Sequence, residues 1–408
     1  MNKMKICIVS REYPPETLWG GIGTFTYNLA HGLKNIGHEV DVVCFTLQQD
    51  ATYNDDGIKV HRISSPKILF LQKNWWNFAR YSLFPFSLLY SYKVMKKITS
   101  LCQEKQYDVV DFPEHIGEGF FSILFQRWPS LVRLYTPLSL IGELGLKRST
   151  NIIDYFLFGL MERFSINNAT IVNSPSQNLA DLVTYKFKYD GRVRIIYNPI
   201  DTEKFAPANR PKVNDQTVHI LFAGRLEDRK GVHILAQAIP AIVKSGYPVQ
   251  FTLLGRDSHG MNGVSSMKEY ITNVLQSEGG LDKVKFIDPV PYHLLVEHYQ
   301  QADIMVVPSL YDNSPYTCLE AMSCGVPVVG TSAGGMPEYI DDGKNGIIVP
   351  PNSPDLLAAA ILDLLKHPQK RIKYGIAARV KVVSVFKREI IAREITELYA
   401  EANQMFYR

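Results

Sequence analysis

Two acidic residues flank the start of a predicted helix in the second half of this chain. Asp312 stands just before the helix, and Glu320 lies inside it, eight positions later, with Pro315 between them. Because eight positions and Pro315 separate them, they cannot be an i,i+4 pair on one helix. We therefore expect one carboxylate to come from a loop and the other from the helix, facing a common ligand.

The predicted start of this helix has the features of an anion site. Ser314 is a favoured N-cap, and Pro315 suits the first helical position because it has no N–H to leave unpaired. The backbone N–H groups of Tyr316 and Thr317 would then point out of the positive end of the helix. The stretch fits a phosphate-bearing ligand with hydroxyl groups. It also fits a purely structural role, since a helix cap before a buried strand occurs in every doubly wound domain.

A glycine-rich loop follows the first predicted strand, with Gly20, Gly21 and Gly23 just before a helix. It matches a dinucleotide fingerprint poorly, because the glycines come about ten residues after the strand and Thr26 replaces the third one. No acidic residue ends the second strand either. We therefore expect no NAD site, and we interpret Gly21 as part of a loop that lets the backbone approach a phosphate or a sugar.

A charged turn, GRLEDRKG, occupies residues 224–231 at the end of another predicted strand. Arg225 and Lys230 could bracket a diphosphate, with the arginine as a planar fork and the lysine as a point charge. Taken alone, the turn also fits a solvated charge cluster.

The composition is that of an ordinary globular protein, with 46% hydrophobic and 21% charged residues. A chain of 408 residues predicts two domains, and a net charge of +4 argues against nucleic acid as a partner. No signal peptide or membrane-spanning segment is visible, so we expect a cytoplasmic protein. The five cysteines follow no ligand spacing and indicate buried thiols in a reducing compartment: Cys7, Cys44, Cys102, Cys318 and Cys324.

Short apolar runs alternate with helical patterns, which predicts α/β domains with mainly parallel sheets. In the first half the predicted strands are Lys5–Ser10, Glu39–Phe45, Ile58–Ile63, Asp108–Phe112, Leu131–Tyr135, Thr170–Asn173 and Val193–Ile196. In the second half they are Val218–Ala223, Gln250–Leu254, Val284–Ile287, Ile304–Val307, Val326–Val329 and Gly346–Val349. We expect a first domain at residues 1–205, a second at 206–380 that begins with a polar linker, and an amphipathic helix at 381–408.

Together these features resemble the retaining glycosyltransferases of family 4. That family has the GT-B architecture, in which two doubly wound Rossmann-like domains face each other across a cleft. The similarity spans nearly the whole chain and keeps its order: YPP with GGIG, GHEV, VNSPS, IIYNPIDTEKF, GRLEDRKG, LLG, ADIMVVPS, D-x7-E with LEAM, GVPVV, GG-x-PE and DG-x-x-G. The resemblance also implies that the C-terminal helix crosses back to the first domain.

The resemblance implies roles at the donor site. Arg225 and Lys230 would hold the diphosphate of a sugar nucleotide, and Glu320 would bind the ribose hydroxyls. Asp312 and the backbone after it would hold the donor sugar. Gly255 and Val290 match the positions beside the base, and the donor-binding set also includes Gly21, Ser314, Tyr316 and Thr317.

The sequence departs from the family pattern at the catalytic positions. Asp312 replaces the usual Glu, which shortens its reach by one methylene. Many relatives have His before Thr in the fifth strand, where this chain has Tyr135-Thr136. Glu114 and His115 enter the loop where relatives often place a His, so the candidate catalytic residues are Asp312, His115 and Tyr135. For His115, an ordinary loop histidine is the alternative.

The implied reaction moves a sugar from a nucleoside-diphosphate sugar, UDP- or GDP-linked, to an acceptor hydroxyl in polysaccharide or glycolipid synthesis. The resemblance implies retention of the anomeric configuration. No two aspartates are spaced i,i+2, as in the Asp-x-Asp of metal-using transferases. We therefore expect neither a metal nor a cofactor. A catalytically degenerate sensor that binds a nucleotide sugar and a sugar-nucleotide epimerase are the alternatives.

The acceptor prediction depends on the segment from Lys67 to Lys97, which is rich in aromatic and basic residues and contains no acid. Trp75 and Trp76 could lie at the level of lipid headgroups while the basic residues meet anionic phosphates. The segment predicts weak peripheral membrane contact that leads a lipid-linked or glycan acceptor to the cleft. The alternative is that its aromatic residues pack into the core of the first domain.

Overall fold

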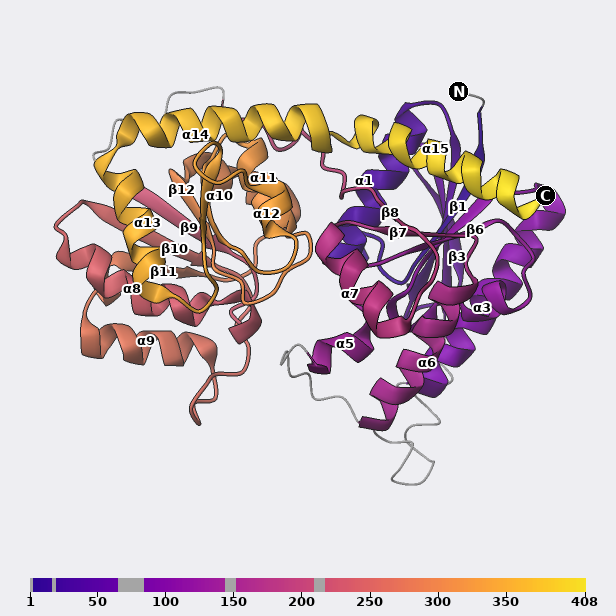
Figure 1. Cartoon of the computed structure of the whole chain (residues 1–408), viewed down its shortest axis with the longest axis horizontal. Helices are drawn as coiled ribbons and strands as arrows, with labels where there is room; N and C mark the ends of the chain where they lie inside the picture. The colour runs from indigo at the N-terminus through magenta and orange to yellow at the C-terminus, as the bar shows by residue number, and fades with distance from the viewer. Residues whose placement is uncertain (1–2, 17–19, 65–83, 144–151, 209–216) are drawn as a thin grey trace. The chain divides into compact units, whose positions relative to one another are not determined.

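The computed structural model describes residues 3–16, 20–64, 84–143, 152–208 and 217–408. The chain forms two compact units. Unit 1 combines Met1–Pro199 with Arg388–Arg408, and unit 2 is Ile200–Lys387. In each unit, helices pack around one open sheet (Figure 1).

The sheet of unit 1 has the strand order β3-β4-β2-β1-β5-β6-β7-β8 within the described ranges. Neighbouring strands are parallel except for the β3–β4 hairpin. The inner strands are buried on both faces, as their continuous apolar runs predict. The strands are β1 (Lys5–Ser10), β2 (Glu39–Thr46), β3 (Ala51–Asp55), β4 (Ile58–Ser64), β5 (Val109–Pro113), β6 (Ser130–Arg133), β7 (Ile171–Ser174) and β8 (Val193–Ile195).

The helices of unit 1 pack against this sheet and against one another. Ser176 caps α7, because its side chain accepts a hydrogen bond from the backbone N–H of Leu179. The helices are α1 (Gly21–Asn35), α3 (Phe84–Glu104), α4 (Phe120–Leu124), α5 (Leu138–Glu143), α6 (Ile152–Asn168), α7 (Gln177–Phe187) and α15 (Arg388–Phe406).

The C-terminal helix α15 is an integral part of unit 1. It packs on α1 at Gly32, where a Cβ would lie 2.7 Å from the carbonyl oxygen of Arg388. Further along α15, the Tyr399 hydroxyl donates to the Asp111 carboxylate at 2.5 Å, and the same oxygen pairs with buried Arg133 at 2.9 Å. A buried charge pair at the sheet therefore anchors a helix from the far end of the chain.

The sheet of unit 2 is parallel throughout its described strands and has the order β11-β10-β9-β12-β13-β14. Its strands are β9 (Val218–Ala223), β10 (Val249–Leu254), β11 (Val284–Ile287), β12 (Ile304–Val307), β13 (Val328–Thr331) and β14 (Gly346–Val349). Its helices are α8 (Val232–Lys244), α9 (Met267–Glu278), α10 (Tyr292–Gln301), α11 (Tyr316–Ser323), α12 (Met336–Tyr339), α13 (Pro354–Lys366) and α14 (Pro368–Lys381).

Every strand predicted from the sequence is confirmed, with ends that differ by at most two residues. The sequence did not predict β3, an edge strand joined to β4 by a tight turn with positive φ at Asp56 and Gly57. Most of the predicted linker lies outside the described residues. None of the described helices is both long and apolar enough to cross a membrane.

The Tyr399 contact yields a stability prediction. Tyr399→Phe removes one hydrogen bond to a buried carboxylate, so it should lower the free energy of unfolding by about 1–3 kcal/mol. Urea denaturation followed by circular dichroism measures this loss. The control is Tyr407→Phe just after α15, where the side chain is 69% exposed and should contribute nothing. An unchanged transition in Tyr399→Phe would show that the contact does not anchor the helix.

Candidate functional site

The strand order of unit 2 places a switch point between β9 and β12. The chain runs from β9 outward to β10 and β11 and then returns to β12 on the other side of β9. Loops after two such strands diverge at the carboxyl edge of the sheet and leave a natural place for a ligand. Arg225 and Lys230 follow β9, and Asp312 to Thr317 follow β12.

A glycine brings these two loops together. Gly231 lies at φ +68°, and a Cβ on it would stand 1.8 Å from the carbonyl oxygen of Pro308 at the end of β12. Only glycine fits there, because both the backbone angle and the space exclude a side chain. The preceding residue, Lys230, is thereby held beside the loop that carries Asp312.

Lys230 and Asp312 form an ion pair, with Nζ 2.5 Å from Oδ2 and only 22% and 12% of the side chains exposed. Arg229 lies 4.0 Å from the same carboxylate and donates to the carbonyl oxygen of Tyr311. Burial acts to raise the pKa of Asp312, but Lys230 and Arg229 outweigh it and hold that pKa below its ordinary value. Burial lowers the pKa of the Lys230 amine, although Asp312 opposes the shift.

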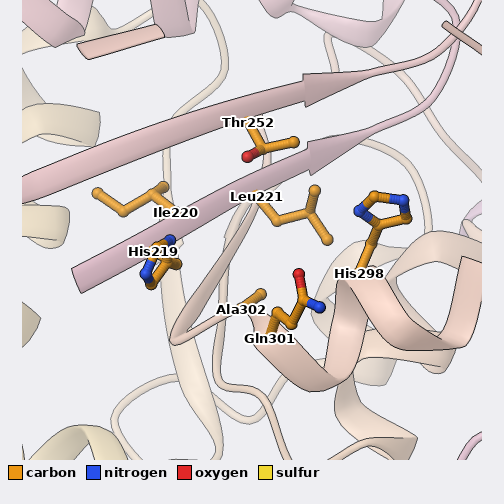
Figure 2. A pocket seen from close by; sticks show the side chains of 7 residues that line it. All are labelled: His219, Ile220, Leu221, Thr252, His298, Gln301 and Ala302. Atoms are coloured by element: carbon orange, nitrogen blue, oxygen red, sulfur yellow. The ribbon is translucent and has the colours of Figure 1, made fainter. Parts of the chain in front are cut away.

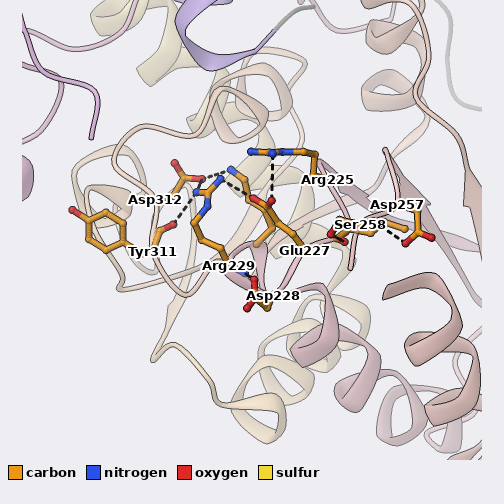
Figure 3. Close-up of polar contacts among 10 residues, drawn as sticks. Arg225, Glu227, Asp228, Arg229, Asp257, Ser258, Tyr311 and Asp312 are labelled. Carbon is orange, nitrogen blue, oxygen red and sulfur yellow. Dashed lines mark hydrogen bonds and ion pairs between the residues drawn. The ribbon is translucent and has the colours of Figure 1, made fainter. Parts of the chain in front are cut away.

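Arg225 is the most exposed cation of this cluster. Half of its side chain is exposed, and its guanidinium lies 3.5 Å from Glu227, which also accepts a hydrogen bond from Arg229 at 2.9 Å (Figure 3). Three cations thus share two carboxylates. Asp228, in the same turn, accepts from the backbone N–H of Arg229, so the charges of the cluster balance. The half-exposed guanidinium of Arg225 is nevertheless placed to bind an anion.

Close backbone contacts hold the neighbouring loops. Gly255, after β10, has a φ of +150°, and a Cβ there would lie 1.9 Å from the carbonyl oxygen of Gly224. Gly335 donates its N–H to the carbonyl oxygen of Asp312 at 2.9 Å. Val290, the other residue expected beside the base, is half-buried in the loop after β11.

The predicted cap of α11 is wrong by one residue. The helix begins at Tyr316, its N-cap is Pro315, and no side chain caps it. Ser314 lies one residue before the N-cap, and its hydroxyl accepts a hydrogen bond from Tyr339 at 2.7 Å. The first intrahelical donor is the N–H of Cys318, so Tyr316 and Thr317 are the first helical residues, as the sequence predicts.

Glu320 lies on α11 and Asp312 lies in the loop before it, which confirms their expected placement. Glu320 is only 3% exposed, and its carboxylate accepts a hydrogen bond from the Tyr299 hydroxyl at 2.7 Å. Burial raises the pKa of Glu320 to about 7, against the opposing effects of Tyr299, Lys204 and Tyr292.

In unit 1 the switch point lies between β1 and β5. Gly21 is the first residue of α1, and a Cβ on it would meet nothing within 4 Å. The N–H of Gly23 donates to the Glu12 carboxylate at 3.2 Å, so one anionic group of the chain itself already lies at this helix start.

His115 and Tyr135 occupy two loops that buried carboxylates tie down. The N–H of Tyr135 donates to both oxygens of Glu114 at 2.9 Å. Glu162, on α6, accepts from the N–H groups of Ile116, at 3.2 Å, and Leu138, at 2.8 Å. It therefore holds the loop after β5 and the loop after β6 at once.

The loop after β5 is strained where it carries His115. The next residue, Ile116, has φ 48° and ψ 25°, a left-handed conformation that is rare for a β-branched residue. Such strain persists only where neighbouring contacts enforce it, and it often accompanies a functional position. The hydrogen bond from Ile116 to Glu162 is one such contact.

Sequence reasoning missed Glu227, Arg229, Tyr299 and Glu162. The first two belong to the charged turn and could have been found there. Tyr299 and Glu162 lie in the middle of helices, and their neighbours in sequence do not indicate a contact with a distant loop.

A small hollow in unit 2 lies away from this cluster. It is lined by residues near the start of β9 and the end of α10, among them His219, His298 and Gln301 (Figure 2). It does not coincide with the carboxyl edge of the sheet. Within the described ranges, no group of three or more His, Cys, Asp or Glu residues could hold a metal ion.

Two family sequence models match the chain. The model described as Glycosyl transferases group 1 matches residues 204–381, and the model described as Glycosyltransferase Family 4 matches residues 19–204. An uncharacterized glycosyltransferase of Methanocaldococcus jannaschii is 29% identical over 99% of this chain and 100% of its own length.

Solved structures share the fold. A sucrose-phosphate synthase from Thermosynechococcus elongatus has a TM-score of 0.76 at 20% identity and covers 99% of this chain and 100% of its own. Anabaena HepE in complex with UDP-glucose has a TM-score of 0.67 at 18% identity and covers 97% and 99%, respectively. At these identities the likeness shows the two-domain GT-B fold.

The buried position of Glu162 predicts an unusual pH dependence of stability. Burial raises its pKa from 4.5 to about 7, so the folded state binds more protons than the unfolded state between these values. This contribution to stability is therefore lost as pH rises through that window, and it amounts to about 3 kcal/mol. Glu162→Gln, which stays neutral, should become more stable relative to the wild type over the same range.

Urea denaturation of both proteins at several pH values measures this difference. Glu104→Gln at the exposed end of α3 is the matched control and should follow the wild type at every pH. Parallel curves for wild type and Glu162→Gln would contradict a raised pKa.

Proposed function

The chain belongs to the glycosyltransferases of group 1 and family 4, and on this premise we propose that it transfers a sugar from a nucleoside-diphosphate sugar to an acceptor hydroxyl. We propose retention of the anomeric configuration. We also propose that the product enters polysaccharide or glycolipid synthesis. The cytoplasmic location expected from the sequence stays a prediction.

The observation that carries this proposal is the cation cluster at the switch point of unit 2. A departing nucleoside diphosphate needs its growing charge stabilised by groups already in place. Arg225 is half exposed, and Lys230 is held beside it by the close approach at Gly231. Both would offer positive charge from positions that the fold already fixes. Anabaena HepE, which shares the fold, binds UDP-glucose, so a UDP-linked sugar is the first donor to test.

The loop and helix after β12 would hold the rest of the donor. Asp312, fixed by Lys230, would place the sugar together with the backbone to Thr317. Glu320 would accept hydrogen bonds from the ribose hydroxyls, since a carboxylate offers two acceptor oxygens. Gly255, in the loop after β10, and Val290, in the loop after β11, would lie beside the base of the nucleotide.

The proposed reaction needs neither a metal nor a cofactor. The support is electrostatic, because the half-exposed guanidinium of Arg225 offers a diphosphate positive charge of the kind that a divalent cation brings in other transferases. The substrate itself provides the leaving phosphate, which would take the proton from the acceptor hydroxyl.

The acceptor would bind unit 1 near His115 and Tyr135. The strained turn at Ile116 and the buried carboxylates that hold both loops support a functional position there. Most of the proposed acceptor-leading segment, residues 65–83, lies outside the described residues, Trp75 and Trp76 included. Its role and weak membrane contact stay predictions.

One assay separates the proposal from the two alternatives. Labelled UDP-glucose and GDP-mannose are incubated with the protein, with and without a membrane lipid extract as acceptor. A transferase forms a labelled lipid or glycan only with the extract, an epimerase alters the sugar without it, and a sensor binds the donor without turnover. Turnover that does not need the extract, or none with either donor, would contradict the proposal.

Arg225→Ala should lower kcat and donor affinity together, each by about ten- to a hundredfold, because charge grows on the leaving diphosphate in the transition state. UDP release at varied UDP-glucose measures both. Lys230→Ala should act in the same direction, but it also leaves Asp312 without its ion partner, so its thermal unfolding must be checked. A chelator should leave the wild-type rate unchanged.

Lys366→Ala, an exposed lysine at the end of α13, is the control and should match the wild type. If Arg225→Ala raised KM with kcat intact, its role would be uniform binding of donor and transition state.

The affinity for UDP should rise as pH increases through about 7, because the ribose hydroxyls donate to Glu320 in its ionised form. Glu320→Gln should bind about ten- to a hundredfold more weakly at alkaline pH, and the gap should narrow at acidic pH. Calorimetric titration with UDP measures both affinities at each pH, and their ratio is independent of the ionisation of UDP itself. A ratio that does not change with pH would contradict a hydrogen bond between Glu320 and the ribose.

A further inference from the structure

One side of unit 1 carries large apolar side chains that no described element covers. They lie on α3, at the end of α4 and on α6, helices that contact one another. Figure 1 labels α3 and α6 in unit 1. The exposed fractions are 38% for Tyr92, 43% for Leu124, 53% for Phe125, 67% for Phe156 and 50% for Leu160. We call these five residues the aromatic face.

The aromatic face is one continuous surface. Tyr92 contacts Phe121 edge to face, with ring centroids 5.7 Å apart, and Phe121 stacks with Phe125 at 6.5 Å. On the other side, Phe121 contacts Phe120, and Phe120 contacts Phe164 of α6 at 5.1 Å.

On α6 the surface continues toward the N-terminus of the helix. Leu160 lies one turn before Phe164, and Phe156 lies one turn before Leu160, so these residues share one side of the helix. A ladder of rings thus connects exposed side chains from three helices.

Two of the exposed rings make cation–π contacts. The Lys96 amine lies 5.1 Å from the Tyr92 ring centroid, and the Arg127 guanidinium lies 5.7 Å from that of Phe125. Arg127 is oriented by a hydrogen bond of 3.3 Å to Thr99. Between these two cations runs a groove of about 460 Å³, also lined by Met95 and Ser100.

Within the described parts of α3, α4 and α6, the one exposed acid is Glu104, at the C-terminal end of α3. The sequence has no Asp or Glu at residues 84–103 or 119–133. The two acids of α6, Asp154 and Glu162, are both fully buried. The aromatic face is therefore cationic as well as apolar.

We propose that the aromatic face, with Lys96 and Arg127, docks unit 1 on an anionic lipid bilayer and that the groove receives a lipid phosphate headgroup. This inference rests on the proposed function, because it gives a transferase of lipid-linked acceptors its place at the membrane. Aromatic and aliphatic side chains enter the interfacial layer, and the basic residues meet lipid phosphates.

The charge pattern favours a bilayer over a second copy of the chain. A symmetric contact between two copies would bring the same patch against itself, with Lys96 and Arg127 facing like charges and no acid to pair with them. An anionic lipid surface supplies the opposite charge across the whole face.

Vesicle co-sedimentation of the full chain tests the proposal. Vesicles of phosphatidylcholine alone are compared with vesicles that also contain phosphatidylglycerol, at low and high salt. The wild type should bind only the anionic vesicles, and salt should weaken this binding. Phe125→Ser with Phe156→Ser should abolish it, and Lys96→Gln with Arg127→Gln should weaken it about 25-fold, or about fivefold per charge.

Unit 2 supplies matched controls. Ile376→Ser removes an aliphatic side chain that is 63% exposed on α14, and Lys366→Gln with Lys373→Gln removes two exposed charges. These variants should bind vesicles as the wild type does. Circular dichroism verifies that all variants fold.

Three outcomes of the vesicle assay would overturn the proposal. They are no binding to anionic vesicles at low salt, equal loss in the unit 2 controls, and binding that survives the aromatic-face variants, whether or not Trp75→Ala with Trp76→Ala removes it. A concentration-dependent mass that Phe125→Ser removes would assign the face to a second copy instead. UDP titration of the same variants tests the proposed function separately. If the wild type failed to bind UDP, the proposed function would be refuted, but vesicle binding would still show whether the aromatic face docks on a membrane.

Discussion

The ion pair between Lys230 and Asp312 is the contact on which the candidate donor site depends. Both groups are largely buried, so the attraction between them must offset the cost of removing two charges from water. Such a pair adds little net stability, but it fixes position. It joins the loop after β9 to the loop after β12, and the close approach at Gly231 makes the contact possible. Arg225 is left half exposed beside this fixed pair.

In unit 1, buried carboxyl groups hold the loops in place. Burial raises the pKa of both Glu114 and Glu162. Their partners include backbone N–H groups from the loops after β5 and β6, and Glu162 also accepts from the Ser139 hydroxyl. Those loops carry His115 and Tyr135, so the geometry on this side is set by hydrogen bonds to the backbone. The left-handed Ile116 indicates how tightly the loop is held.

The two units also differ in what their surfaces offer. In unit 2, the charged groups gather at the carboxyl edge of the sheet, where paired and exposed cations meet. In unit 1, a cationic surface lies on α3, α4 and α6, and it is coated with aromatic rings. This contrast matches the two ligands that we propose. A phosphate group needs hydrogen-bond donors that converge on it, whereas a lipid surface needs apolar side chains with basic residues around them.

The sequence by itself determined the strands of both sheets, because buried parallel strands require continuous apolar runs that need no partner to be recognised. It also determined the charged turn at Arg225 and Lys230 and the placement of Asp312 and Glu320, through motifs of local spacing. Tertiary structure alone decided β3, whose polar residues form a strand only because β4 pairs with them. It likewise decided that the Ser314 hydroxyl pairs with Tyr339 and does not cap the helix, and that Lys230 pairs with Asp312. Each of these features depends on a contact with another segment of the chain, and a local sequence pattern does not indicate which segment that is.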